Sequence, residues 1–132
     1  MKKYILTLVL TIALLPSMAQ KGLVRKGDYH FKMMAYPKAI PYYTKALKKD
    51  STLQEATFKL ADCYRLTNNR QMAEIWYAKA VKMSTVLPIY KFYYGQALMN
   101  NGKFAQAKKW MTDFVLDNKT DGRGQSFVKA ID

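Results

Sequence analysis

Cysteine and histidine are nearly absent from the sequence, which has one of each among its 132 residues. Cys63 has no second cysteine with which to form a disulfide or a cysteine-based metal site. Its neighbours Leu60, Ala61 and Tyr64 predict a buried thiol instead. His30 lacks a second metal-ligand candidate at a useful helical spacing, so we expect no bound metal and no cofactor.

The sequence also lacks the common catalytic and nucleotide-binding patterns. It contains no glycine-rich phosphate loop, no HExxH motif, no GxSxG motif and no paired carboxylates. These classes of active site are therefore excluded, and we expect a protein that is not an enzyme.

Acidic residues are scarce. Nine Asp and Glu accompany 22 Lys and Arg, which gives a formal net charge of +13. Such a balance favours an anionic partner or surface, although charge alone does not choose among nucleic acid, lipid head groups and acidic protein. Half of the 132 residues are hydrophobic, which fits one small domain with its own core.

No apolar run is long enough to span a bilayer, which takes about 20 residues. The run at residues 4–15 follows a short cationic start and precedes the letters "PSMA". This order is typical of a secretory signal peptide, residues 1–19, cleaved before Gln20. Cleavage would remove Lys2 and Lys3 and lower the net charge from +13 to +11. We therefore expect an exported protein of the periplasm or outer membrane, which disfavours nucleic acid as a partner.

The sequence repeats itself at an offset of 34 residues, without insertion or deletion. Five sets of positions align: Ala39, Ala73 and Ala107; Gly27, Ala61 and Gly95; Tyr43, Tyr77 and Met111; Tyr36, Arg70 and Phe104; and Ala46 and Ala80 with the larger Phe114. Small residues recur where two helices must approach closely, and large ones recur where they fill the space between helices. Such a period predicts stacked helical repeats.

The pattern resembles the tetratricopeptide repeat (TPR) family, whose unit is a pair of antiparallel helices. The resemblance is carried by "KGDYHFKMMAYPKAIPYYTKALKKD", "LADCYRLTNNRQMAEIWYAKAVKMS" and "YGQALMNNGKFAQAKKWMTDFVLDN". It implies an all-α solenoid of three helix-turn-helix repeats in residues 20–119, at about 20–53, 54–87 and 88–121, followed by a partial helix in 120–132. The proline expected at the end of each unit is replaced by Ser51, Thr85 and Lys119.

Local signals agree with this repeat phase. They predict helices at about 21–33, 36–49, 53–67, 70–83, 87–101 and 104–117. Thr52 and Glu55 predict a capping box, and the asparagines and glycine at 68–69 and 100–102 predict left-handed helix ends. Pro41 removes a backbone hydrogen-bond donor and is expected to loosen the start of its helix.

The resemblance implies that a partner binds on the concave surface made by the first helix of each pair. The repeat phase gives Phe58, Asp62, Arg65, Phe92, Gln96 and Met99 as candidates for this partner-binding groove. Aromatic and Met side chains would offer area to an inserted peptide, and Arg65 could hold a carboxylate. The alternative is that several of these residues are core or ordinary solvated surface.

One known activity of the family is not implied. Chaperone-binding members clamp a carboxyl terminus with Lys and Asn in the groove. This chain has Val24, Asp28, Lys59, Ile89 and Tyr93 at the matching places.

A basic surface is predicted on the second helices, at Lys48, Lys49, Lys108 and Lys109. The default interpretation is a solvated face without a binding role. The functional interpretation is a surface that binds an acidic protein partner or an anionic envelope lipid.

A signal peptide followed at once by such repeats also resembles the amino-terminal portion of OmpA-family envelope proteins of Bacteroidetes, including PorE-like components of the type IX secretion machinery. Two hypotheses follow: a protein–protein interaction adaptor of the cell envelope, and an accessory segment of a longer peptidoglycan-associated protein. Residues 122–132 start a further apolar pattern that is too short for a full cap. Either this helix alone shields the third repeat, or it starts a further repeat of a longer protein, which is the interpretation that we favour. The triplet Asp50-Ser51-Thr52 resembles the O-glycosylation motif of exported Bacteroidetes proteins.

Overall fold

The computed structural model describes residues 18–83 and 85–131, and within them the chain is entirely helical apart from turns. Residues 18–32 are helical, and the helices that follow are α2 (Tyr36–Lys49), α3 (Gln54–Leu66), α4 (Arg70–Ala80), α5 (Pro88–Asn100), α6 (Phe104–Asp117) and α7 (Gly122–Ile131). The predicted signal peptide lies outside the described residues except for its last two positions. Among the described residues, no helix is both long and apolar enough to cross a membrane.

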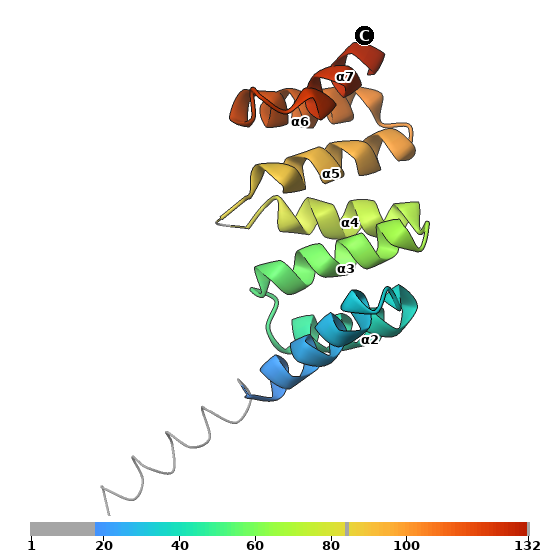
Figure 1. Ribbon diagram of the computed structural model, residues 1–132, viewed down its shortest axis with the longest axis vertical. Coiled ribbons are helices and arrows are strands. Elements are labelled where there is room, and N and C mark those ends of the chain that lie inside the picture. The colour runs from blue at the N-terminus through green and yellow to red at the C-terminus, as the bar shows by residue number, and fades with distance from the viewer. Residues whose placement is uncertain (1–17, 84, 132) are drawn as a thin grey trace, which may run out of the picture.

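The helices form a stack of antiparallel pairs (Figure 1). The helix at 18–32 pairs with α2, α3 pairs with α4, and α5 pairs with α6, while α7 packs on α6. Contacts of α2 with α3 and of α4 with α5 join each pair to the next. The predicted all-α fold of helix-turn-helix repeats is confirmed.

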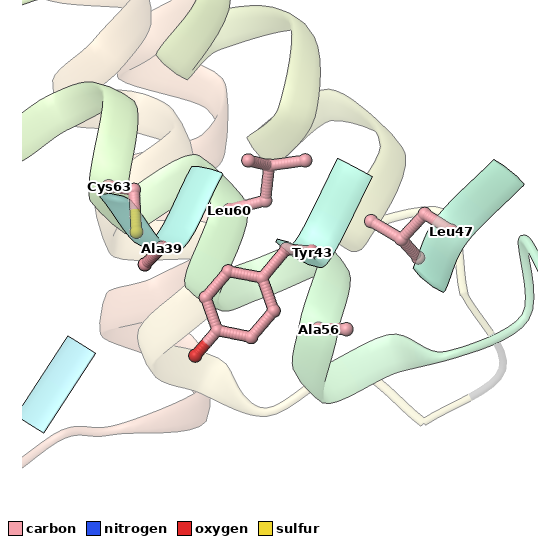
Figure 2. Close-up of a cluster of buried hydrophobic side chains, with 6 residues drawn as sticks. All are labelled: Ala39, Tyr43, Leu47, Ala56, Leu60 and Cys63. Atoms are coloured by element: carbon pink, nitrogen blue, oxygen red, sulfur yellow. The ribbon is translucent and has the colours of Figure 1, made fainter. Parts of the chain in front are cut away.

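Each pair closes where a small residue of its first helix meets a large side chain of its second. A Cβ atom added to Gly27 would lie 2.6 Å from the ring of Tyr43, and one added to Gly95 would lie 2.9 Å from Met111. Tyr43, Tyr77 and Met111 are fully buried. Figure 2 shows Tyr43 among Leu60, Ala56 and other core residues of α2 and α3.

The turn inside each pair uses a left-handed residue at the same repeat position. Met34, Asn68 and Gly102 have φ angles of 55°, 60° and 76°. The predicted left-handed ends at 68–69 and 100–102 are confirmed. At the equivalent position of the first repeat, Met34 adopts the same left-handed conformation, which glycine and asparagine adopt with less strain.

Several local expectations were wrong. α4 ends at Ala80, three residues early, because Lys82 and Met83 donate to carbonyls only three residues back and tighten the chain into a turn. Thr52 does not cap α3, whose N-cap is Leu53, because the Thr52 hydroxyl instead donates to Asp50 at 2.5 Å. The expected loosening at Pro41 stays a prediction, since Pro41 lies within α2, which is continuous from Tyr36 to Lys49.

In the third repeat, Phe114 stands where the first two repeats have alanine, and α7 accommodates its larger side chain. Phe114 is buried like its counterparts Ala46 and Ala80. A Cβ atom on Gly124 of α7 would lie 2.6 Å from the Phe114 ring, so the glycine provides the space that the phenylalanine requires. Phe127 and Val128 of α7 complete this cluster.

The close crossings predict that Ala73 tolerates no larger side chain. Ala73 is 2% exposed, so we expect Ala73→Leu to lower the free energy of unfolding by about 1 to 3 kcal/mol through overpacking. The matched control is Ala105→Leu, at an exposed position of α6. Urea unfolding followed by circular dichroism measures both, and equal midpoints for Ala73→Leu and the parent would contradict the crossing.

The left-handed turn at Met34 predicts a stabilising substitution. The Met34 side chain is 75% exposed, so its removal costs little packing, whereas Met34→Gly relieves backbone strain. We expect the free energy of unfolding to rise by up to about 1 kcal/mol, after allowance for the greater flexibility of unfolded glycine. Gly102→Ala should have the opposite effect, since no atom lies within 4 Å of the added Cβ and only the backbone strain acts. A lower stability for Met34→Gly would refute this account.

Candidate functional site

Two tyrosine–aspartate hydrogen bonds recur one repeat apart. The Tyr43 hydroxyl donates to Asp28 at 2.7 Å, and the Tyr77 hydroxyl donates to Asp62 at 2.5 Å. In each case the carboxylate comes from the first helix of a pair and the hydroxyl comes from the second. These bonds place a carboxylate at the same point of two successive first helices.

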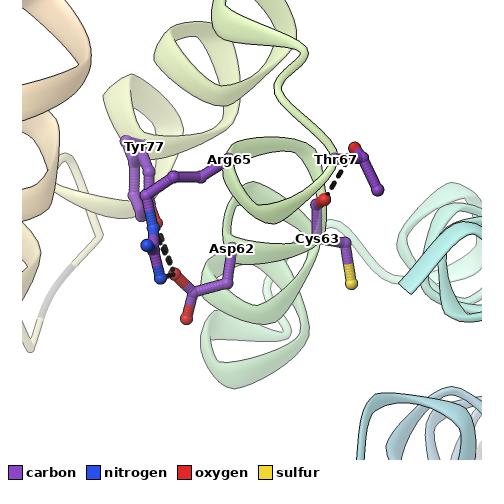
Figure 3. A network of polar contacts seen from close by, with 5 residues as sticks. All are labelled: Asp62, Cys63, Arg65, Thr67 and Tyr77. Carbon is purple, nitrogen blue, oxygen red and sulfur yellow. Dashed lines mark hydrogen bonds and ion pairs between the residues drawn. The ribbon is translucent and has the colours of Figure 1, made fainter. Parts of the chain in front are cut away.

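Arg65 joins the second of these pairs. Its Nε and Nη2 atoms lie 3.1 and 2.8 Å from Asp62 Oδ1, and its Nε also donates to the Tyr77 hydroxyl at 2.9 Å. Figure 3 shows Arg65 and Tyr77 converging on the Asp62 carboxylate. The guanidinium carbon also lies 4.6 Å from the centre of the Tyr93 ring, a cation–π contact with α5. The four residues Asp62, Arg65, Tyr77 and Tyr93 form what we call the Arg65 cluster.

The protonation states in this cluster follow from burial and pairing. Burial, followed by the charge and hydrogen bond of Asp62, raises the pKa of Tyr77 well above its usual range, so its hydroxyl remains a donor. Burial disfavours the charge of Arg65, but Tyr77 and Asp62 outweigh this effect and raise its pKa. The cluster therefore carries a fixed, internally compensated pair of charges.

Lys59, also on α3, makes a link to the preceding repeat. Its Nζ lies 2.7 Å from Asp28 of the helix at 18–32 and 2.7 Å from Glu55 of α3. Burial lowers the pKa of Lys59, but the hydrogen bonds to Asp28 and Glu55 outweigh it and raise the pKa overall. Lys59 and Arg65 thus follow one another along α3, each held by a carboxylate. We call the surface formed by the helix at 18–32, α3 and α5 the first-helix face.

The predicted groove residues have different environments. Asp62 and Arg65 lie together in the Arg65 cluster, and Gln96 and Met99 are partly buried on α5. Phe58 is partly buried and stacks on Tyr90 with ring centres 3.7 Å apart, so it fills the space between repeats.

The expectation that Phe92 offers area to a peptide is wrong. Phe92 is 4% exposed and packs against Phe114 and Phe127, while Arg123 of α7 lies over its ring. α7 therefore covers this side chain and makes it part of the core.

Sequence reasoning did not identify Tyr77 and Tyr93 as members of the site. A signal was present, because Asp28 and Asp62 recur at the same offset as Tyr43 and Tyr77. A hydrogen-bond acceptor and a hydrogen-bond donor that recur together indicate a repeated polar contact as well as repeated packing.

The predicted basic surface is exposed. Lys48 and Lys49 lie in the last turn of α2, where their charge also complements the helix dipole, and Lys108 and Lys109 lie on α6. Two other lysines make ion pairs between helices, Lys91 with Asp117 at 2.6 Å and Lys103 with Glu74 at 2.5 Å.

Cys63 is fully buried, as predicted. Burial, with the nearby Asp62 carboxylate, raises the pKa of its thiol to about 12, so the thiolate required of a nucleophile does not form near neutral pH. Figure 3 shows Cys63 on the side of α3 away from the Arg65 cluster. In residues 18–83 and 85–131, no group of three His, Cys, Asp or Glu side chains is placed to hold a metal ion.

Comparison with known proteins identifies this architecture. The sequence pattern described as "Tetratricopeptide repeat" matches residues 55–85, which comprise α3 and α4. The chain folds as tetratricopeptide repeats. No curated protein matches the sequence significantly.

Several solved TPR structures are similar to this chain at low sequence identity. The second TPR domain of human RPAP3, in complex with an HSP70 peptide, has a TM-score of 0.77 at 21% identity, over 88% of this chain and 97% of that one. The first TPR of Spaghetti (RPAP3), bound to an HSP90 peptide, has a TM-score of 0.77 at 23% identity, over 87% and 91%. The Yersinia enterocolitica type III secretion chaperone SycD, in complex with a peptide of the translocator YopD, has a TM-score of 0.73 at 18% identity, over 84% and 90%.

The Arg65 cluster predicts that one hydroxyl stabilises the pairing of α3 with α4. Tyr77→Phe removes the donor to Asp62 and the acceptor of Arg65 Nε while keeping the buried ring. We expect a loss of about 1 to 3 kcal/mol in the free energy of unfolding, as for a buried charged group that loses a hydrogen bond. Tyr29→Phe, at a side chain that is 62% exposed, is the control and should unfold like the parent. Identical unfolding of all three proteins would show that the hydrogen bond contributes nothing.

Proposed function

We propose that the chain is a non-catalytic binding module that holds an extended protein segment on its first-helix face. The observation that carries the proposal is the Arg65 cluster, where a partly exposed guanidinium lies over the ring of Tyr93 beside a fixed carboxylate. Arginine and tyrosine together offer polar contacts and a rigid apolar surface, the combination that contributes most at protein interfaces. The peptide-bound TPR structures of similar fold support this use of the architecture.

The chemistry of the face favours an internal segment over a free carboxyl terminus. Asp28 lies where chaperone-binding members have a carboxylate-clamping residue, and its charge would repel a terminal carboxylate. Lys59 and Arg65 are already paired with Asp28 and Asp62. A segment of mixed polarity, with a side chain or backbone carbonyl beside Arg65, meets these groups without an uncompensated charge.

We also propose that the module works in the cell envelope, in the periplasm or at the outer membrane. The support is the order of cationic start, apolar run and small-residue cleavage site in residues 1–19. The same order followed by repeats supports the second proposal, that the module belongs to a longer OmpA-like envelope protein. Cell fractionation, with an antibody against the repeats, tests both, since it reports the location and the full size of the product.

The binding proposal predicts where a partner can be crosslinked. A photo-crosslinking amino acid in place of Gln96, on α5, should give a discrete adduct in cells that produce the full chain. The same amino acid in place of Lys109, exposed on α6, should give none. Arg65→Gln, introduced into the chain that carries the crosslinker at position 96, keeps a neutral donor for Asp62. We expect it to weaken capture by about 1 to 4 kcal/mol, and circular dichroism checks that the variant is folded.

The control for the opposite face is charge reversal at Lys48, Lys49, Lys108 and Lys109. If these residues only steer the partner, reversal should change the association rate and its salt dependence more than the stability of the complex. An adduct that forms only from position 109, and that Arg65→Gln leaves unchanged, would assign binding to the basic surface. Phe92 is unsuited to this test because its truncation would open the core.

A further inference from the structure

A pocket lies between the second helices α2 and α4 and the first turn of α3. Its volume is about 580 Å³. The first-helix face is formed by first helices, whereas this pocket is lined mainly by second helices, so it belongs to a different face. Its size falls in the range of small-molecule sites, which is about 300 to 1,000 Å³.

The lining of this pocket separates into an apolar floor and a cationic rim. Leu47 of α2, Trp76 of α4 and Met83 form most of the floor. Lys48, Lys79 and Lys82 lie around them, and none of the described residues that line the pocket is acidic. These six side chains come from the first two repeats only, so they form a compact site and not a surface that extends along the whole stack.

One rim lysine, Lys79, is held close to the floor. Lys79 Nζ lies 4.0 Å from the centre of the Trp76 ring, which keeps one ammonium over the indole. Three cations around one apolar hollow repel each other and focus a positive potential on it, which an anion would relieve. Trp76 has a further unused capacity, because its buried Nε1 has no hydrogen-bond partner among the described residues.

We propose that this pocket binds a small amphipathic anion, a single apolar chain or ring that ends in a carboxylate. The apolar part would cover Leu47, Trp76 and Met83, and the carboxylate would accept hydrogen bonds from the rim lysines. Neutral apolar molecules would leave the three cations uncompensated, and small inorganic anions would leave the floor exposed to water. The site does not depend on the proposed capture of a protein segment, which uses other helices.

The probe for this site is decanoate, used with the full chain below the concentration at which it forms micelles. The chain has two tryptophans, so Trp110→Phe leaves Trp76 as the reporter at the floor of the pocket. We expect a saturable change in Trp76 fluorescence on addition of decanoate. Decanol, with the same chain and no charge, and acetate, with the charge and no chain, should each bind at least about tenfold more weakly, since each lacks one of the two kinds of contact.

Matched lysine variants test whether the rim recognises the charge. Replacement of Lys48, Lys79 and Lys82 together by Gln should weaken decanoate binding about tenfold or more, because hydrogen bonds to charged groups are among the stronger ones. Replacement of the exposed Lys32, Lys119 and Lys129 by Gln removes the same total charge elsewhere and should leave binding unchanged. Replacement of the three rim lysines by Arg keeps the charge and should retain binding, while circular dichroism checks that each variant is folded.

Three results would overturn the proposal. The first is the absence of saturable binding by the folded parent. The second is equal binding of decanoate and decanol, which would indicate simple apolar adsorption. The third is an equal loss of binding in the rim and control variants, which would indicate attraction to net charge alone. None of these results bears on crosslinking from position 96, so the two proposals fail separately.

Discussion

The structure depends on one contact, the close approach of a small residue on a first helix to a large side chain on the second helix of its pair. Gly27 beside Tyr43 and Gly95 beside Met111 leave no space for a larger residue. In the first two repeats the same crossing also places a polar bond, because Asp28 and Asp62 directly follow the small residues Gly27 and Ala61. A tyrosine that covers the small residue therefore brings its hydroxyl to the next carboxylate. Packing and the polar cluster have a common geometric origin.

The third repeat shows what happens when the tyrosine is lost. Met111 fills the space against Gly95 but has no hydroxyl, and Gln96 replaces the aspartate. Both members of the polar pair have changed together, which avoids a buried carboxylate without a donor. The neighbouring core is correspondingly apolar, with Phe92, Met111 and Phe114 covered by α7. The polar features of the first-helix face are therefore concentrated in the first two repeats and in Tyr93, which reaches back to Arg65.

The fold could be predicted from the sequence because repeat spacing is a strong constraint, whereas the site required contacts between repeats. A 34-residue recurrence of small residues, without a gap, fixes which helix faces meet, and the predicted helices agree with the observed ones except near their ends. Those ends depend on single hydrogen bonds, such as the one by which Asp50 holds Thr52. The repeat phase also predicts the helix face on which a residue such as Phe92 lies. It does not predict that α7 covers this residue. Likewise, the spacing of Asp62 and Arg65 suggests an ion pair, but the participation of Tyr77 and Tyr93 follows only from the fold.

The pairing of acidic residues gives the two faces different electrostatic character. Asp28, Glu55 and Asp62 are held by Lys59 and Arg65, so the charges of α3, in the middle of the first-helix face, are compensated. Around the pocket between α2 and α4, Lys48, Lys79 and Lys82 have no acidic neighbour in the lining. Charge compensation makes recognition on the first-helix face depend on shape and directed hydrogen bonds, and it should respond weakly to salt. Recognition at the pocket depends on a focused positive potential and should weaken as salt rises.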